Sequence, residues 1–344
     1  MNGERLQLAF VGMHPTRRRS LLEKYASAGR VLQRIARGAE KVPPHAREAA
    51  KVSPEQRLGE LSAAGIRAVF REDLPDHLAF LPDAPDVLFV RGRLPRERGV
   101  AVVGTRKATS YGLRLAEQFG HALAGAGWPV MSGLAKGVDA AAHRGAVDSD
   151  GVSVAVLGCG PDRWYPASNR ALGETILSTG GAVVSEYPPG TPPSGWRFPP
   201  RNRIISGLSA VTVVVEARPN GGALITARAA LEHGREVLAV PGDVDRATSE
   251  GCNLIIRDGA IPVLGAADLV EAVSLVLGPP TGIPASSSGG LVELIGPVGR
   301  TIDWVVEAVD RPPGEVLADL ARLEASKQVH WVGGLIVANP PSGR

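Results

Sequence analysis

Two arginines separated by one residue are the strongest candidates for chemistry in this chain. Arg201 and Arg203 flank Asn202 in a predicted loop, FPPRNRIISGL, that begins at Phe198. A guanidinium holds an anion through two parallel hydrogen bonds, so the pair predicts that at least one arginine binds a phosphate group. Aromatic rings beside arginines are suited to stacking on unpaired bases, and Phe198 and Trp196 are placed for that role. The alternative for Phe198 is an anchor in the core.

Three glycine-rich turns add further candidates, each where an apolar run gives way to a helix-like run. The first contains Gly104, Thr105 and Arg106; the second contains Ser132, Gly133, Lys136 and Gly137; the third contains Gly221, Gly222, Ala223 and Thr226. A helix that starts after a strand offers unpaired amides and the positive end of its dipole, and glycine lets a phosphate approach closely. Taken alone, each turn also fits an ordinary strand-to-helix connection. Together they predict a site for several phosphates, as on a polymer.

Acid–base chemistry has weaker support. Asp139 and His143 lie four residues apart on the helix predicted after the second turn and form a conceivable pair, although a structural histidine is the commoner outcome. Glu216 and Asp243 stand at strand ends, but the sequence fixes no second carboxylate or nucleophile beside either. Nothing in the sequence therefore requires hydrolysis.

Length and composition favour a cytoplasmic protein of more than one domain. The chain has 344 residues, whereas single domains cluster near roughly 100 to 200 residues. No N-terminal signal pattern is present, and no segment approaches the roughly 20 apolar residues of a membrane span. Cys159 and Cys252 lack metal-type spacing, so we expect no disulfide scaffold, metal or cofactor.

Charge is distributed unevenly along the chain. Residues 1–99 hold 18 Lys+Arg against 12 Asp+Glu, residues 100–290 hold 15 against 16, and residues 291–344 hold 5 against 7. The net charges are therefore +6, −1 and −2, which add up to the +3 of the whole chain. Because the middle segment is nearly neutral, an anion site there has to be built from individual arginines and backbone amides.

Periodicity predicts three structured regions. Residues 6–65 carry apolar positions at helical spacing and predict a small helical domain, bounded at 1–70. Strand-like and helix-like runs alternate over 71–277, which predicts a doubly wound α/β sheet that binds ligands at the carboxyl ends of its strands. The composition of 278–290 predicts a linker. Two helices and a hairpin are predicted over 291–344, as in a winged helix.

The motifs, taken in chain order, resemble those of the DNA-processing protein A family, also called DprA or Smf. VGTR, SGLAKGVDA, AVLGCG, SEY, FPPRNRIISGL, GALITA and AVPG follow one another in family order. The resemblance is dense over residues 87–275 and weaker at both ends. It implies an extended Rossmann domain that forms a homodimer, commonly preceded by a SAM-like helical domain and followed by a winged helix.

The resemblance also implies a function. Proteins of this family bind single-stranded DNA without sequence preference, protect it during natural transformation and help to load the RecA recombinase, and they are not regarded as enzymes. The family's DNA contacts fall here on Arg106, Lys136, Phe198, Arg201 and Arg203. One departure is Gly221, where the family more often has serine; backbone binding survives this change, but a hydroxyl contact does not.

Two other functions compete with this one. Nucleotide-hydrolysing enzymes of the lysine-decarboxylase-like group have a related sheet and a GGxGTxxE loop, but here Leu224, Ile225 and Arg228 replace its Gly, Thr and Glu, so the catalytic carboxylate is missing. Independent duplex binding by the C-terminal domain is opposed by its net charge of −2, and we expect that domain to contact proteins or to have an accessory role. The basic N-terminal part is expected either to extend the DNA path or to contact a partner.

Overall fold

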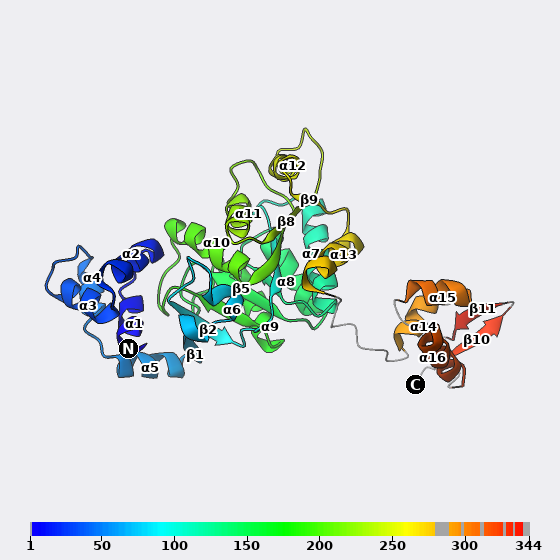
Figure 1. The fold of residues 1–344 in the computed structure, drawn as a ribbon, viewed down its shortest axis with the longest axis horizontal. Helices are drawn as coiled ribbons and strands as arrows, with labels where there is room; N and C mark the ends of the chain where they lie inside the picture. The colour runs from blue at the N-terminus through cyan, green and yellow to red at the C-terminus, as the bar shows by residue number, and fades with distance from the viewer. Residues whose placement is uncertain are drawn as a thin grey trace. The chain divides into compact units, whose positions relative to one another are not determined.

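The computed structural model describes residues 2–278, 289–296, 299–309, 313–325, 328–332 and 334–339. The chain forms two compact units, Met1–Gly282 and Ile283–Arg344 (Figure 1). Most of the predicted linker, residues 279–288, lies outside the described residues. Within the described ranges, no helix is long and apolar enough to cross a membrane.

A nine-stranded mixed sheet forms the centre of the first unit, with strand order β1-β2-β6-β5-β4-β3-β7-β8-β9. The strands are β1 (Ile66–Phe70), β2 (Val87–Gly92), β3 (Gly99–Val103), β4 (Val130–Ser132), β5 (Ser153–Leu157), β6 (Ala182–Ser185), β7 (Ser209–Val214), β8 (Glu236–Ala239) and β9 (Ile261–Pro262). The seven neighbouring strands β6, β5, β4, β3, β7, β8 and β9 are parallel to one another. Strand β2 pairs antiparallel with both β6 and β1. The predicted α/β class is confirmed, and the antiparallel edge makes the sheet mixed.

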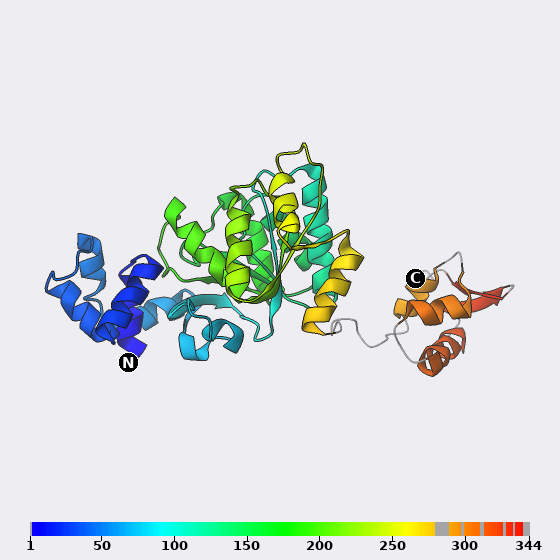
Figure 2. The same ribbon diagram turned by 45° about the horizontal axis from the view of Figure 1, so that its top comes forward.

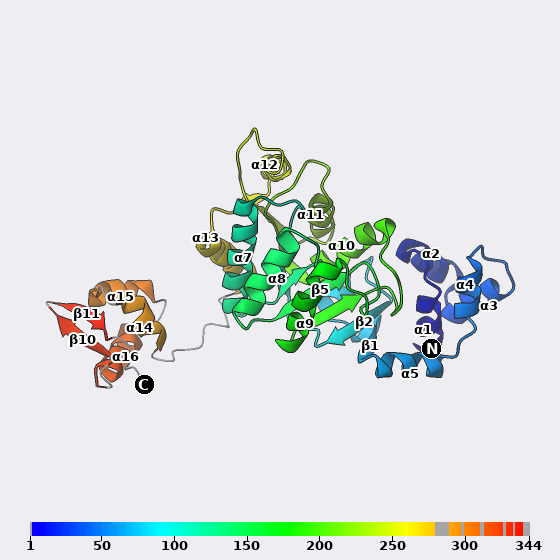
Figure 3. The ribbon, with the colours of Figure 1, turned by 180° about the vertical axis from the view of Figure 1, so that it is seen from behind.

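Helices cover both faces of the sheet, and this layering can be followed in Figures 2 and 3. One face carries α6 (Asp76–Ala79), α10 (Phe198–Gly207), α11 (Gly222–Glu232) and α12 (Glu250–Arg257). The other carries α7 (Ser110–Gly125), α8 (Val138–Asp148), α9 (Arg170–Ser178) and α13 (Ala266–Leu277). Central strands such as GVAVV of β3 are buried on both sides, which explains their unbroken apolar sequence.

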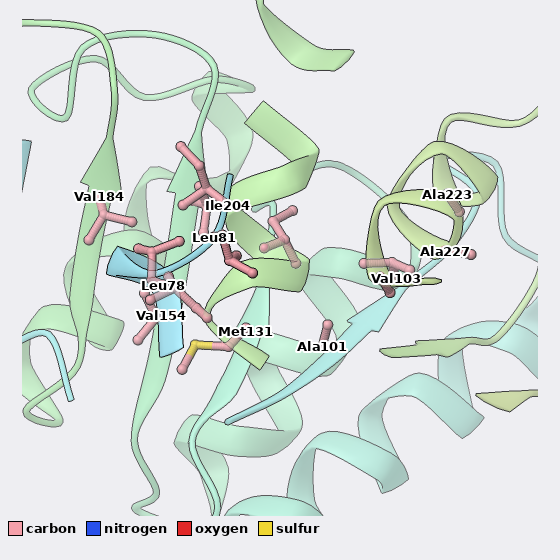
Figure 4. Close-up of a cluster of buried hydrophobic side chains, with 14 of the residues drawn as sticks. Leu78, Leu81, Ala101, Val103, Met131, Val154, Val184, Ile204, Ala223 and Ala227 are labelled. Carbon is pink, nitrogen blue, oxygen red and sulfur yellow. The ribbon is translucent and has the colours of Figure 1, made fainter. Parts of the chain in front are cut away.

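The first face is packed by side chains from widely separated segments. Leu81, Val154 and Ile204 belong to one buried cluster, together with Ala227 of α11 and Val103 of β3 (Figure 4). This packing fixes α10 and α11 over the strands whose ends carry the predicted turns. Burial of apolar side chains therefore sets the positions of α10 and α11 on the sheet. The polar residues of the turns are not needed for this packing.

The paired arginines lie on helix α10, where the sequence predicted a loop. Pro199 and Pro200 stand in the first turn of this helix, where a missing backbone amide costs nothing and the fixed φ favours helix formation. Each residue of an α-helix advances by roughly 100°, so residues two apart project roughly 200° apart. Arg201 and Arg203 consequently point to opposite sides of α10.

Five helices precede the sheet. They are α1 (Asn2–Phe10), α2 (Pro15–Tyr25), α3 (Ala28–Ala36), α4 (Pro44–Ala49) and α5 (Pro54–Ala63). Leu8, Val31 and Ile35 belong to their own core, whereas Leu6 and Leu61 share a cluster with Phe89 of the sheet. The helical N-terminal region is thus packed on the antiparallel edge, whose strand β1 falls inside the range 1–70.

A buried ion network, the Arg18 joint, connects α2 to the sheet and to α10. Arg18 donates to one carboxylate oxygen of Glu186 at 2.6 Å, and Arg203 donates to the other at 2.7 Å. Arg18 and Glu186 are each 4% exposed. Arg203 also lies 3.9 Å from Asp83. Two guanidinium groups therefore share one buried carboxylate. Through Glu186, Arg203 of α10 helps to hold the N-terminal helices against the sheet.

The described residues of the second unit form three helices and a hairpin. Its elements are α14 (Gly289–Ile295), α15 (Ile302–Ala308), α16 (Pro313–Ala325), β10 (Val329–Val332) and β11 (Leu335–Ala338), and the two strands pair antiparallel. Leu291, Val305, Leu320 and Ile336 lie in its core. The predicted hairpin is confirmed, and α14 is an additional helix that the sequence pattern did not reveal.

Replacing Arg18 tests the joint. Arg18→Met removes a buried, charged hydrogen bond but leaves Glu186 paired with Arg203, so we expect the free energy of unfolding to fall by about 2 kcal/mol. Arg19→Met is the matched control, because Arg19 is 40% exposed and lies 4.0 Å from Glu23; its expected effect is within about 0.5 kcal/mol. Urea denaturation measures both. Equal effects of the two substitutions would contradict the joint.

Candidate nucleic-acid interface

The three glycine-rich turns and α10 converge at the carboxyl ends of β3, β4 and β7. These strands are adjacent and parallel, so the turns that follow them lie side by side. They enclose a main pocket of about 570 Å³ and a side pocket of about 210 Å³. Arg106, Tyr165, Phe198 and Arg201 line both. The two pockets therefore form one continuous site.

Most of the residues predicted from the sequence line this site. The main pocket is lined by Gly104, Thr105, Arg106, Phe198, Arg201, Asn202, Gly221, Gly222, Ala223 and Thr226. The side pocket adds Gly133 and Lys136. The structure places the remaining three, Ser132, Gly137 and Arg203, outside the lining of both pockets, and each has a different set of neighbours.

Ser132 and Gly137 shape the second turn from within. The Ser132 hydroxyl is buried and donates to the Val102 carbonyl at 2.7 Å, which joins β4 to β3. Gly137 has a φ of +81°, and a side chain there would collide with the carbonyl oxygen of Thr105. Only glycine allows the backbones of the first and second turns to approach so closely.

Arg201 forms the base of the site and is 5% exposed. Its Nη1 donates to the carbonyl of Gly133 at 2.9 Å and also to the carbonyl of Val156, and its Nε donates to Asn202 at 3.2 Å. Asn202 in turn donates to the carbonyl of Gly222 at 3.2 Å. One guanidinium thus links α10 to the second turn directly and to the third through Asn202.

A buried carboxyl lies close to the buried guanidinium at this base. Burial raises the pKa of the Asp139 carboxyl, and Arg201 opposes that shift. Burial also lowers the pKa of the Arg201 guanidinium, which Asp139 opposes in turn. Gly133 separates the two groups, since a Cβ there would lie 2.5 Å from Arg201 and 2.7 Å from Asp139. Burial and the mutual attraction of these two groups therefore act in opposite directions on each pKa.

Exposed cations and aromatic rings form the rim. The Phe198 ring is half-buried, stacks on Tyr165 with centroids 5.3 Å apart and an angle of 28°, and has the Arg106 guanidinium 5.1 Å from its centroid. Lys136 is exposed beside them. Tyr165 is not among the residues predicted for the site; its sequence signal is its place in the turn after β5, another strand that ends at this edge.

Trp196 and Arg203 lie away from these pockets. Trp196 stacks on His14 of the N-terminal region, with ring centroids 5.4 Å apart. Arg203 is held by Glu186 and Asp83 in the Arg18 joint. The helical geometry of α10 is the physical reason that only one of its two arginines lines these pockets.

The acid–base candidates occupy structural positions. His143 Nδ1 is hydrogen-bonded with the Ser153 hydroxyl at 2.7 Å, and burial lowers the pKa of its imidazole to about 3. Glu216 accepts from the amide of Thr109 at 2.8 Å and from its hydroxyl at 2.6 Å. Thr109 is the N-cap of α7, so Glu216 fixes the start of that helix. Asp243 is exposed at the side chain and lies 2.7 Å from an arginine three residues on.

No cluster of three metal-ligating side chains occurs among the residues that the structure describes. Cys159 and Cys252 are both buried and free of disulfides. Burial raises the pKa of the Cys159 thiol to about 11 and that of the Cys252 thiol to about 12. Both thiols therefore remain protonated near neutral pH and behave as core side chains.

The buried histidine predicts a pH dependence of stability. The pKa of His143 is about 3 in the folded protein, against about 6.5 when unfolded, so the unfolded state binds more protons between these values. Stability is therefore lost as the pH falls, by about 2 kcal/mol between pH 7 and pH 5. A His143→Gln variant should show a decrease smaller by that amount in urea denaturation. The exposed His121→Gln serves as control, and unchanged pH dependence in His143→Gln would overturn this assignment.

Comparison with known proteins places these features in a family. The family model "DNA recombination-mediator protein A" matches residues 66–274. The chain is 39% identical over 277 residues to the protein Smf of Escherichia coli (strain K12), a match that covers 76% of this chain and 74% of that protein.

Two solved structures share the fold. DNA processing protein A of Streptococcus pneumoniae matches with a TM-score of 0.64 and 33% identity, over 77% of this chain and 95% of that one. DNA processing protein A of Helicobacter pylori, described with a single-stranded DNA binding mode, matches with a TM-score of 0.54 and 24% identity, over 60% and 95%. The sheet, both pockets and the motifs around them fall within the family match, and the chain belongs to the DNA recombination-mediator protein A family of DprA and Smf proteins.

Proposed function

We propose that the protein binds single-stranded DNA without regard to sequence and acts as a recombination mediator. The observation that carries this proposal is the convergence of Arg106, Lys136 and Arg201 around the stacked rings of Tyr165 and Phe198 at one edge of the sheet. Cations suit the phosphates and exposed rings suit unpaired bases. The H. pylori relative, whose structure addresses single-stranded DNA binding, has the same fold.

Backbone amides supply a second kind of phosphate contact. The N-terminus of α11 at Gly221 has no side-chain cap, and Gly222 is exposed with open space around its Cβ position. The α11 amides and dipole are therefore available to an anion. By contrast, α7 is capped by the Thr109 hydroxyl. Because the first amides of α7 are already capped, Thr105 and Arg106 are the groups of the first turn that would contact the DNA strand.

The proposed contacts carry no sequence information. Phosphates are the same at every nucleotide, and every base has a face on which a ring can stack. The DNA-contacting set is the twelve predicted residues that line the two pockets, with Tyr165 added. Ser132 and Gly137 support the second turn, and Arg203 acts from the other side of α10 by holding that helix in place.

The wider role follows from family membership. We propose that the protein works as a homodimer, protects single-stranded DNA during natural transformation and loads RecA, with a SAM-like domain over residues 1–70 and a winged helix over 291–344. The α14–α16 helices and the β10–β11 hairpin support the winged helix. Nucleotide hydrolysis has no such support, since Arg228 replaces the required carboxylate and is exposed on α11.

Removal of the rim cations should weaken DNA binding. We expect Arg106→Ala and Lys136→Ala each to lower the affinity for oligothymidine about 10-fold and to reduce the slope of log affinity against log salt by about 0.7 for each phosphate that is no longer neutralised. Fluorescence anisotropy at several salt concentrations measures both quantities. Lys107→Ala is the control, because this exposed neighbour of Arg106 lines neither pocket. Affinity like that of the unaltered protein in both variants would refute the site.

Stacking can be separated from charge. Phe198→Leu keeps an apolar residue against Gly158 but removes the ring, so affinity should fall by about 1 to 3 kcal/mol. The salt slope should stay unchanged, because every cation is retained. Phe80→Leu, which removes an 83% exposed ring outside both pockets, should change neither quantity. A reduced salt slope without weaker binding at low salt would show that Phe198 only positions Arg106.

A further inference from the structure

The N-terminal region contains a second groove beside the proposed DNA site. This N-terminal groove has a volume of about 280 Å³ and is lined by Met13, His14, Arg17, Pro43 and Trp196, among others. We propose that a single strand of DNA leaving the main pocket continues over Trp196 onto the basic segment of residues 14–41, which contains α2 and α3. The proposal rests on the proposed function and extends its DNA path.

One short segment forms a wall of both cavities. Pro193, Gly195 and Phe198 line the main pocket, while Trp196 lines the N-terminal groove. The segment runs through the turn Gly195–Arg197 directly into α10. Trp196 and Phe198 are only two positions apart in the sequence. A DNA strand that lies across Phe198 therefore has a short distance to cover to reach Trp196.

The N-terminal groove repeats the chemistry of the rim. In the main pocket the Phe198 ring is stacked at 28° on Tyr165 and lies beside the guanidinium of Arg106. In the groove the Trp196 ring is stacked at 28° on His14, and the Arg197 guanidinium lies 4.6 Å from its centroid. Trp196 is nevertheless 42% exposed. A large ring held beside a cation, with much of its surface open, is suited to stacking on an unpaired base.

The charge of the N-terminal region matches a polyanion, and Arg17 is the cation of that region that lines the groove. Residues 14–41 contain eight Lys+Arg and two Asp+Glu, so they carry the whole +6 excess of residues 1–99. The two acids are already engaged: Glu40 lies near Arg34 and Arg17, and Glu23 lies near Arg19. Arg30, Arg37 and Lys41 are exposed. These cations would attract the phosphates that follow the main pocket.

A single strand fits these observations better than a duplex. Trp196 can stack only on a base that is unpaired, because paired bases are covered by their own neighbours. The Arg18 joint also connects α2 to α10. The basic segment that contains α2 is therefore anchored beside the helix that lines the main pocket. A rigid extension adds contacts without a further cost of ordering the protein.

Oligonucleotide length tests the extension in the full chain. A short oligothymidine of about 5 nucleotides should occupy the main pocket alone, whereas one of about 16 nucleotides should reach the groove. We expect Trp196→Leu to weaken binding of the long oligonucleotide about 5- to 100-fold, with no change for the short one. Arg17→Ala should reduce the salt slope by about 0.7 for the long oligonucleotide only.

Two matched controls accompany these variants. Phe80→Leu removes an exposed ring, and Arg257→Ala removes a 71% exposed cation on α12; neither residue lines the groove, and neither variant should alter the difference between the two lengths. Unchanged affinity of Trp196→Leu for the long oligonucleotide would overturn the extension. So would a weakening confined to duplex DNA of the same length, since that would place a duplex in the groove.

The test also separates the extension from the function on which it rests. If Arg106→Ala weakens both lengths while Trp196→Leu weakens neither, the main pocket stands and only the extension is refuted. If Arg106→Ala and Lys136→Ala weaken neither length, the proposed function itself fails.

Discussion

The buried guanidinium of Arg201 is the interaction on which the site depends. It is bonded to the carbonyls of Gly133 and Val156 and, through Asn202, to the turn at Gly222. Three segments that are far apart in the chain are thereby held around one cation. A buried guanidinium is costly unless it is paired and hydrogen-bonded, and these hydrogen bonds together with the nearby Asp139 carboxyl offset part of that cost.

The middle segment is nearly neutral, so the positive charge of the proposed site comes from a few individually placed cations. A surface rich in lysine attracts DNA from a distance but also repels itself, whereas a few fixed cations act only on a strand already in place. Arg106 and Lys136 at the rim supply the exposed part of the field, and the α11 amides add partial charges without adding net charge. The basic excess of the protein is concentrated instead in residues 14–41, which contain α2 and α3.

Sequence reasoning predicted the turns well because their chemistry is local. An apolar run ending at glycine announces a strand end, and adjacent parallel strands bring such ends together. The α/β sheet could be predicted in this way, and twelve of the fifteen predicted site residues line the two pockets. The antiparallel strand β1 could not, since Ile66–Phe70 is short and its pairing with β2 is a tertiary contact.

The separation of Arg201 from Arg203 shows where local reasoning ends. Their spacing looks like a double clamp if the segment is a loop, but on a helix the same spacing sends the side chains to opposite sides. Whether FPPRNRIISGL forms a helix is decided by burial of Ile204 and Ile205 against the sheet, which no pattern within the segment reveals. Arg203, freed from the pocket, meets Glu186 and Arg18 instead. The same helix thus anchors the N-terminal helices on one side and forms the floor of the pocket on the other. A substitution on either side is therefore expected to change the position or stability of α10.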